Sequence, residues 1–268
     1  MSVVAIDAGN HETKFYDGKR FVQFPSILGY DWRERNLKQQ QGEHDYEWEY
    51  KDQKGFAGTL ALYESECAES RKGDSKAHPD ALLRILIALH QFTDGIEHKI
   101  VVGQPIKTHT KEEKETIKEM IVGRHEIAVN GRKKHLLITR CEVAAEGVTA
   151  GLLVPGGGTV RVIDIGSGTV NFGTLIDRRF NDKGSFTLTN GMETVRTADP
   201  VSFGRQIALK ALSNGWGKND AVYLCGGGAE ALQESLRAYF INAQLIIGDP
   251  VTANVRAFYL IAGKLYGQ

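Results

Sequence analysis

The sequence predicts an α/β fold made of two similar halves. Two stretches carry this prediction: VVAIDAGNHETKF near the beginning and VRVIDIGSGTVNFG later in the chain. Each contains an apolar strand, an Asp-x-Gly turn and a second strand, and Asp7 and Asp164 take the same place in the two. Strand patterns and helix patterns also alternate in both halves, which is typical of α/β proteins. A repeated opening of this kind indicates an internal duplication.

The composition fits a globular protein of one large or two modest domains. The chain has 268 residues, and 41% of them are apolar, which is enough to bury a core. Lysine plus arginine and aspartate plus glutamate are equal in number, 33 each. This neutral balance argues against a protein held mainly by the phosphates of DNA.

The cysteines and the apolar runs indicate a soluble, cytoplasmic protein without a membrane partner. Cys67, Cys141 and Cys225 are isolated, so their spacing predicts neither disulfides nor a zinc site. Met1 leads straight into a strand pattern rather than a signal peptide. The longest apolar run, ALLRILIALH, is interrupted by Arg84 and is too short to span a bilayer.

Turn pairs and cap residues define the elements of the first half. Asp17-Gly18 and Asn130-Gly131 are hairpin turns, and Pro79 starts a mostly buried helix. Residues 30–55 are polar and lack a core period, so a small surface insertion is expected there. The expected elements are a strand at 2–7, a hairpin over 12–25, a helix over 78–92, a strand at 98–105, a charged helix over 108–123, a hairpin over 125–140 and a helix of small residues over 142–154.

The second half begins after Pro155 and its three glycines, which mark a boundary. Asp199 is placed as a helix N-cap, with Pro200 at the first helical position. The expected elements are strands at 160–165, 170–176 and 186–189, a helix over 199–212, a strand, glycine turn and helix over 220–240, and a strand, Asp-Pro turn and helix over 243–267.

Some residues of the chain outside these motifs are expected at the surface. The tryptophans Trp32, Trp48 and Trp216 stand in polar surroundings, and Trp216 in NGWGKND is expected in an exposed loop. His125 and His135 flank a hairpin and show no metal spacing. The basic cluster GRKKH at 131–135 fits a solvated turn better than a contact with a partner.

The doubled Asp-x-Gly turn suits phosphate and metal chemistry. Backbone N–H groups of a glycine-rich turn can approach a phosphate because no Cβ blocks them. An aspartate at the strand end can hold Mg²⁺, directly or through water. A single turn of this kind is most often structural, but two copies favour a clamp in which both turns close on the same phosphates. The hydroxyl groups of Thr13, Ser167 and Thr169 can add donors to this clamp.

The two turns differ in charge. Lys14 stands seven residues after Asp7, and Asn171 takes the same place after Asp164, so one turn carries a cation and the other does not. Farther along, YLCGGGAEAL places Gly226, Gly227 and Gly228 between a strand and a helix. This glycine run offers flat backbone for a nucleoside, although it lacks the spacing of a dinucleotide fingerprint and also fits a tight strand-to-helix turn.

Five stretches in order, IDAGNHETK, TRCEVAAEGVTAGL, VIDIGSGTVNFG, LCGGGAEAL and DPVTANVRAFYLIAG, resemble the actin, Hsp70 and sugar-kinase superfamily. Within it they are most similar to the plasmid-segregation actins of the ParM and AlfA type. The resemblance implies a two-domain actin-like fold with duplicated ribonuclease-H-like cores and a nucleotide cleft between them. Domain I would span 1–148 with a small IB insertion at about 30–75, and the helix at 250–268 would pack back on it. Domain II would span 149–249.

The resemblance also implies roles for individual residues. Asp7 and Asp164 would hold Mg²⁺, through water, and take part in catalysis. Glu142 would position the attacking water at a helix start, where a helix dipole also favours an acid for structural reasons. Glu146, one turn on, is the second candidate for this role. The implied nucleotide-binding residues are Gly9, Asn10, Thr13, Lys14, Gly166, Ser167, Gly168, Thr169, Gly226, Gly227 and Gly228.

The chain departs from the pattern of these relatives in several ways. The interval from Asp164 to Cys225 is 225 − 164 = 61 residues, which leaves room for little or no subdomain IIB. The choice between adenine and guanine therefore stays open. Asn171 replaces a common acid, and Ala257 stands where glycine is usual. Arg205 and Lys210 either reach the pocket or form a solvated helix face.

The function implied is that of a filament-forming protein that binds and hydrolyses Mg²⁺–ATP, with GTP as the alternative. Subunits would join head to tail in a contact that does not close. The filament would segregate plasmid DNA through an adaptor protein and would not contact nucleic acid itself. Two alternatives remain: a small-molecule kinase similar to pantothenate kinases, and a scaffold that binds nucleotide without hydrolysing it. The ANVRAFY stretch favours the actins over the kinases.

Overall fold

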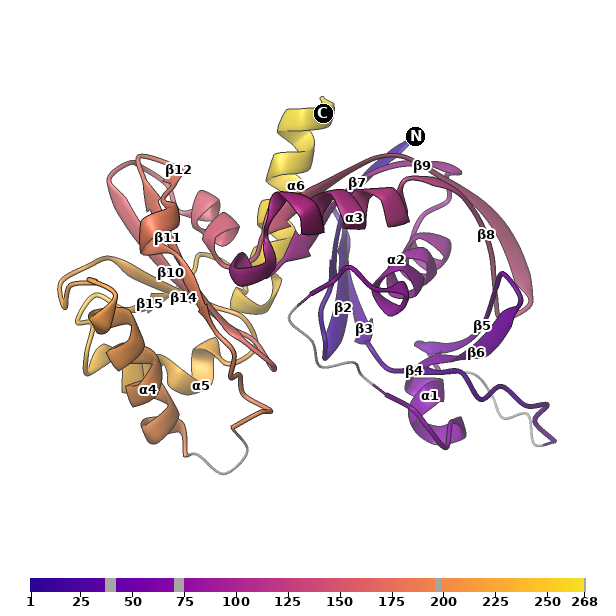
Figure 1. The fold of residues 1–268 in the computed structure, drawn as a ribbon, viewed down its shortest axis with the longest axis horizontal. Coiled ribbons are helices and arrows are strands. Elements are labelled where there is room, and N and C mark those ends of the chain that lie inside the picture. The colour runs from indigo at the N-terminus through magenta and orange to yellow at the C-terminus, as the bar shows by residue number, and fades with distance from the viewer. Residues whose placement is uncertain (37–41, 70–74, 196–198, 268) are drawn as a thin grey trace. The chain divides into compact units, whose positions relative to one another are not determined.

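A computed structural model of the chain describes residues 1–36, 42–69, 75–195 and 199–267 (Figure 1). The chain divides into two compact units. Unit 1 comprises Met1–Val102, Glu112–Val143 and Ala262–Gln268, and unit 2 comprises Gly103–Lys111 and Ala144–Ile261. The functional domains expected at 1–148 and 149–249 stay a prediction.

Unit 1 is built on a mixed sheet, in which the described residues form nine strands in the order β3-β2-β1-β7-β9-β8-β5-β6-β4 (Figure 1). The strand β1 lies between an antiparallel partner, β2, and a parallel partner, β7. The strands are β1 (Ser2–Ala8), β2 (Glu12–Tyr16), β3 (Phe21–Pro25), β4 (Leu28–Gly29), β5 (Asp45–Tyr50), β6 (Gln53–Gly58), β7 (Glu97–Gln104), β8 (Gly123–Val129) and β9 (Arg132–Ala145).

The helices of unit 1 are α1 (Thr59–Glu64), α2 (Pro79–Phe92) and α3 (Lys111–Ile121). The helix α2 is buried along most of its length and packs against β1, β2 and β8. Its start is the one predicted, since Pro79 occupies the first turn and the ring of His78 accepts a hydrogen bond from the backbone N–H of Ala81 at 3.2 Å. The Asn130-Gly131 turn is also confirmed, because both residues have positive φ angles.

The expectation of a surface insertion at 30–55 is wrong for its second part. Residues 45–58 form the hairpin of β5 and β6, which belongs to the sheet. Tyr46, Trp48 and Phe56 are buried, and the Trp48 indole donates a hydrogen bond to the Phe56 carbonyl at 3.0 Å. Strand alternation places the aromatic residues inside and the intervening glutamates outside. Residues 37–41 lie outside the described part of the chain.

The helix expected over 142–154 is also wrong. The strand β9 continues to Ala145, and a short 3₁₀ turn, η2 (Val148–Leu153), follows. Between them Gly147 has a φ of +73°, a conformation that L side chains rarely adopt. The small residues in this stretch therefore serve a strand end and a tight turn.

Unit 2 repeats the strand arrangement found around β1 in unit 1. Among the described residues its six-stranded sheet has the order β12-β11-β10-β14-β15, with β13 paired to β11. The strand β10 lies between an antiparallel partner, β11, and a parallel partner, β14, as β1 does in unit 1. The strands are β10 (Thr159–Ile165), β11 (Val170–Ile176), β12 (Arg179–Phe180), β13 (Phe186–Leu188), β14 (Val222–Cys225) and β15 (Gln244–Leu245).

The helices of unit 2 are α4 (Pro200–Ser213), α5 (Ala229–Arg237) and the greater part of α6 (Ala253–Tyr266). Short 3₁₀ turns are η1 (Ile106–Thr108), η3 (Asp182–Gly184) and η4 (Pro250–Thr252). The N-cap predicted at Asp199 is confirmed, since its carboxylate accepts hydrogen bonds from the backbone N–H groups of Val201 and Ser202. The helices α4 and α5 pack against each other, and a Cβ at Gly204 would lie 2.5 Å from Ser235 Cβ.

Trp216 lies in the core of unit 2, so its predicted exposure is wrong. The side chain is 3% exposed and packs among Phe172, Phe186 and Phe240. The guanidinium of Arg161 lies 5.1 Å from its ring centroid. Trp32, in contrast, is 42% exposed.

The two histidines predicted at the surface differ in exposure. The three cysteines are free, and His135 is exposed. His125 is half-buried instead, because its ring bonds with the Tyr50 hydroxyl at 2.8 Å. Among the described helices none combines the length and the apolar character needed to cross a membrane.

Candidate functional site

The two Asp-x-Gly stretches fold as hairpins with the same register. In unit 1 Asp7 is paired with Lys14 across β1 and β2. In unit 2 Asp164 is paired with Asn171 across β10 and β11. Directly opposed residues of an antiparallel pair lie on the same face of the sheet. The equivalence of Lys14 and Asn171 that the sequence predicts is therefore confirmed.

In unit 1 the Asp7 carboxylate is buried at the end of β1 and lies beside a lysine that sequence reasoning missed. The ammonium of Lys76, which is also buried, lies 3.6 Å from Asp7 Oδ1 and donates a hydrogen bond to the Ala8 carbonyl at 2.7 Å. Oδ1 of Asp7 is buried and has no hydrogen bond within the described residues. No local motif marks Lys76, because it comes 76 − 7 = 69 residues after its partner.

The residues predicted for the first motif lie in different environments around the hairpin turn at 9–11. Gly9 and Asn10 are half-buried in the turn. A Cβ at Gly9 would lie 2.6 Å from the Glu12 carbonyl oxygen, so the turn requires glycine. Thr13 is fully buried, and its hydroxyl lies 2.8 Å from that of Ser26. Since neighbouring strand residues point to opposite faces, the side chain of Thr13 is turned away from that of Lys14.

We expect Lys76→Met to lower the free energy of unfolding by about 1–3 kcal/mol, because it leaves the buried Asp7 carboxylate without its cation. The double variant Asp7→Asn/Lys76→Met removes both charges. Its loss should be smaller than the sum of the two single losses, as measured by urea denaturation of all four proteins. Strict additivity of the two losses would show that the two groups do not interact.

In unit 2 the second motif forms a turn of half-buried residues around Asp164. The backbone N–H of Gly166 donates to the Thr169 carbonyl at 2.9 Å and closes the turn. The carbonyl groups of Gly166 and Ser167 accept hydrogen bonds from Met192 and Glu193. The side chains of Ser167 and Thr169 are half-buried, and so is Gly168.

The glycine run at 226–228 adjoins this turn. The strands β10 and β14 place Asp164 opposite Cys225, directly before the run. Gly226 has a φ of +85°, and a Cβ there would lie 2.5 Å from the Ile165 carbonyl oxygen and 2.7 Å from Asp164 Oδ1. Gly228 donates its N–H to the same carbonyl at 3.0 Å, whereas Gly227 is exposed with open space around its backbone. The second motif and the glycine run thus lie directly beside each other.

Glu142 lies within a strand and not at a helix start. Its side chain is 36% exposed, and its Oε2 lies 3.3 Å from the Lys118 ammonium on α3. Burial lowers the pKa of Lys118, but the carboxylates of Glu142 and Glu115 outweigh it and raise that pKa above its ordinary value. Glu142 thus belongs to a surface ion pair within unit 1.

Glu146 lies in the turn between β9 and η2, within unit 2, and is buried. Its backbone N–H donates to the Gln104 carbonyl at 2.9 Å. A Cβ at the next residue, Gly147, would lie 3.2 Å from Asp164 Cβ, so this turn adjoins the second motif. Glu142 stands four positions earlier, which is about 13 Å along a strand.

The structure also places three other residues that the sequence singles out, Arg205, Lys210 and Ala257. Arg205 and Lys210 are exposed on α4, and the Lys210 ammonium lies 5.9 Å from the Phe186 ring. Both thus belong to a solvated helix face. Ala257 is fully buried on α6, where its methyl group is accommodated in the core.

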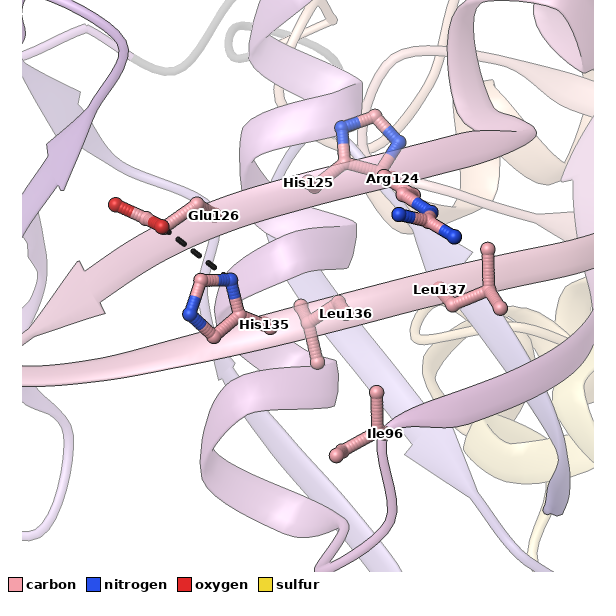
Figure 2. A pocket seen from close by; sticks show the side chains of 7 residues that line it. All are labelled: Ile96, Arg124, His125, Glu126, His135, Leu136 and Leu137. Atoms are coloured by element: carbon pink, nitrogen blue, oxygen red, sulfur yellow. Dashed lines mark ion pairs between the residues drawn. The ribbon is translucent and has the colours of Figure 1, made fainter.

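A pocket of about 390 Å³ lies elsewhere, on β8 and β9 of unit 1 (Figure 2). Figure 2 shows the one ion pair drawn there, between His135 Nδ1 and Glu126 Oε2 at 3.3 Å. The pocket includes none of the predicted site residues. Its lining consists of Ile96, Arg124, His125, Glu126, His135, Leu136 and Leu137.

Comparison with known proteins shows which chains share this fold. Residues 5–148 match the family model described as actin-like proteins, N-terminal domain. Searching the curated proteins gives no match.

Solved structures match across nearly the whole chain. An AlfA filament bound to AMPPNP is similar with a TM-score of 0.79 and 22% identity, over 99% of this chain and 98% of the other. The AlfA filament from plasmid pLS32 of B. subtilis has a TM-score of 0.80 and 19% identity, over 97% and 98%. An archaeal actin homolog in complex with ADP has a TM-score of 0.77 and 18% identity, over 98% and 100%.

Proposed function

The chain belongs to the family of actin-like proteins, and from this premise we propose that it binds and hydrolyses a Mg²⁺–nucleoside triphosphate and assembles into filaments. The observation that carries the proposal is the repeated hairpin. Asp7 and Asp164 stand near the ends of equivalent strands, each followed by a turn that contains glycine. The matching strand orders of the two sheets agree with duplicated ribonuclease-H-like cores, which we propose close on one nucleotide from two sides.

The turns at 9–11 and 166–169 would contact the phosphates. Glycines at Gly9 and Gly166 let the backbone approach an anion closely. Lys14 would supply the positive charge from the first hairpin, while Asn171 at the same register supplies an uncharged amide. Ser167 and Thr169 remain candidate hydroxyl donors. Thr13 contributes to this site through the backbone alone, because its side chain is directed to Ser26.

The aspartates have the chemistry that Mg²⁺ requires. The buried Oδ1 of Asp7 has no hydrogen bond within the described residues, so a hydrated cation can satisfy it. Asp164 offers a second carboxylate at the equivalent strand end. When bound, the ion would neutralise charge on the phosphates. Asp7 and Asp164 would hold it, and the Lys76 ammonium would balance the charge of Asp7 before nucleotide arrives.

Glu146, not Glu142, is the better candidate for orienting the attacking water. It is buried one residue from the Gly147 turn that adjoins Asp164. A carboxylate in such a setting can hold a water molecule and accept its proton. Glu142 is engaged by Lys118 on the surface of unit 1.

The glycine run at 226–228 would support the nucleoside. Gly227 is the exposed member of the run, so its backbone is accessible to a base or ribose. With little or no subdomain IIB, one side of the base lacks the cover that larger relatives give it. ATP is the proposed nucleotide and GTP the alternative.

Assembly and biological role follow from the relatives. Two AlfA structures that the chain resembles are described as filaments, one of them bound to AMPPNP. We propose that this chain likewise joins copies of itself head to tail in the cytoplasm. The filament would segregate plasmid DNA through a DNA-binding adaptor protein, because the neutral chain has no excess of basic residues for direct binding.

The proposal is tested by light scattering and phosphate release in one sample. We expect scattering to rise above a critical protein concentration when Mg²⁺–ATP or Mg²⁺–GTP is added, and phosphate to be released with it. EDTA should abolish both signals. The variant Asp164→Asn is the matched control, since it keeps the size of the side chain and removes the charge.

Different outcomes separate the alternatives. Scattering without phosphate release would favour the non-hydrolysing scaffold. No scattering with either nucleotide at any protein concentration would contradict the proposal of a filament and favour the small-molecule kinase. Phosphate transfer to an added small alcohol substrate such as pantothenate would then support that kinase.

A further inference from the structure

The side chain of Asn254, on the first turn of α6, joins two parts of the candidate site in unit 2. Its amide nitrogen Nδ2 donates a hydrogen bond to Asp164 Oδ2 at 3.0 Å. Its amide oxygen Oδ1 accepts one from the backbone N–H of Gly147 at 2.9 Å. An amide has two donor hydrogens on one side and an acceptor on the other, and this arrangement uses both. Neither an aliphatic side chain nor a carboxylate can replace it.

The position of Asn254 is set by the chain before it. The Asp249 carboxylate caps η4 by accepting from the Val251 N–H at 2.8 Å. The Pro250 carbonyl accepts from the N–H of Gly226 at 2.9 Å, which ties this turn to the glycine run. Ala253 is fully buried directly before Asn254. The start of α6 is therefore held against the same strand ends that carry the second motif.

Asn254 provides the shorter of two amide contacts to Asp164. Asn171 Nδ2 also lies near Asp164 Oδ2, at 3.4 Å. Two amide donors on one carboxylate oxygen restrict rotation of the side chain. The other oxygen, Oδ1, is then directed toward the glycine run, where a Cβ at Gly226 would lie 2.7 Å away.

The same amide fixes the turn that carries Glu146. Gly147 has a φ of +73°, and a Cβ there would lie 2.8 Å from Asn171 Cβ, so the turn is closely packed. Its N–H is held by Asn254, and the N–H of Glu146 is held by the Gln104 carbonyl. Backbone hydrogen bonds at Glu146 and Gly147 thus hold this turn in place.

We propose that Asn254 is a positioning residue that sets the Asp164 carboxylate and the Glu146 turn relative to each other, so that nucleotide hydrolysis depends on the start of α6. This inference rests on the proposed function. Asn254 does not touch the reacting atoms and acts through Asp164 and Glu146.

The test compares Asn254→Ala and Asn254→Asp with the wild-type chain. At neutral pH both variants should lower kcat about 10- to 100-fold, the range seen when partners behind a metal ligand are removed. The KM for nucleotide should change less than kcat does, since the phosphate-binding backbone is intact. Asn242→Ala is the matched control, because that exposed side chain only donates to the Asn219 carbonyl, outside the site.

The folded state of the variants distinguishes positioning from general damage. Asn254→Asp keeps an acceptor toward the Gly147 N–H but replaces the amide donor toward Asp164 with a second oxygen. Both variants should therefore lose kcat although they remain folded at the assay temperature, as measured by circular dichroism. A loss of kcat that only follows a loss of folded protein would overturn the proposal.

Affinity for ADP supplies a readout that does not need turnover. Calorimetry in Mg²⁺ and in EDTA should show that Asn254→Ala weakens only the Mg²⁺-dependent part of binding, because Asp164 is no longer oriented. If the wild-type chain neither binds nor hydrolyses nucleotide, the proposed function fails. If the wild-type chain binds and hydrolyses nucleotide and the two variants match it in kcat and in Mg²⁺ dependence, the positioning role of Asn254 is contradicted while the proposed function stands.

Discussion

Replacing Glu146 by alanine is expected to lower the rate of nucleotide hydrolysis by about 100-fold or more, while nucleotide affinity stays nearly unchanged. The reason is the place of Glu146 in the buried turn beside Asp164. Binding would depend instead on the backbone turns at 9–11 and 166–169, which this change does not touch. Single-turnover phosphate release at saturating nucleotide measures the rate, and a fluorescent nucleotide measures the affinity.

Glu142→Ala is the matched control for this prediction. It removes an identical side chain from the same strand region, but one that is paired with Lys118 at the surface. We expect less than about a threefold change in rate, because an exposed ion pair contributes little even to stability. A large loss in Glu142→Ala together with normal turnover in Glu146→Ala would return the role to Glu142.

Trp216→Ala is expected to destabilise unit 2 by about 3–5 kcal/mol, the range for removing a large buried aromatic residue. The indole is 3% exposed among three phenylalanines, and its loss leaves a cavity that these rings cannot fill. The stacked guanidinium of Arg161 also loses its aromatic partner. Urea denaturation followed by circular dichroism measures the effect without relying on tryptophan fluorescence.

Trp32→Ala provides the comparison within the same chain. That side chain is 42% exposed, so its removal should cost less than about 1 kcal/mol. Equal losses in the two variants would contradict the placement of Trp216 in the core. Trp216→Phe should recover part of the lost stability, since it keeps an aromatic ring in the cluster.

The repeated hairpin was predictable because its signal is local. The apolar strand, the Asp-x-Gly turn and the second strand lie within about a dozen residues, and turn length alone then sets the register. The seven-residue spacing of Asp7 and Lys14 matches that of Asp164 and Asn171, and the observed pairing follows from it. The glycine run adjoins the second motif for a similar reason, since parallel neighbouring strands end at the same edge.

Partners that are distant in sequence could not be predicted in this way. Lys76 reaches Asp7 only because the chain after β6 returns to the end of β1. Trp216 stands among polar residues, and its aromatic neighbours come from two strands, β11 and β13, and from the segment after α5. The residues next to Lys76 and Trp216 in the sequence therefore predict neither the ion pair nor the aromatic cluster.

Two secondary-structure predictions are wrong because residue composition counts in them for more than hydrophobic periodicity. In DYEWEY the glutamates suggested a solvated segment, although Tyr46 and Trp48 alternate with them as in a half-buried strand. In EVAAEGVTAGLLV the alanines suggested a helix, although Gly147 interrupts it with a positive φ. The role predicted for Glu142 comes from the family resemblance, and the helix start expected at that residue is a strand in the structure.

The division of the chain between the two units sets an order of events on the ribosome. Unit 1 draws residues from Ala262 onward, and the Tyr266 hydroxyl donates to the Ile100 carbonyl at 3.2 Å across 266 − 100 = 166 positions. At ordinary rates of synthesis these positions take about 10–30 s to translate. Every residue of unit 2 emerges within that interval. Unit 1, whose synthesis begins first, therefore receives its last residues only after all of unit 2 has been made.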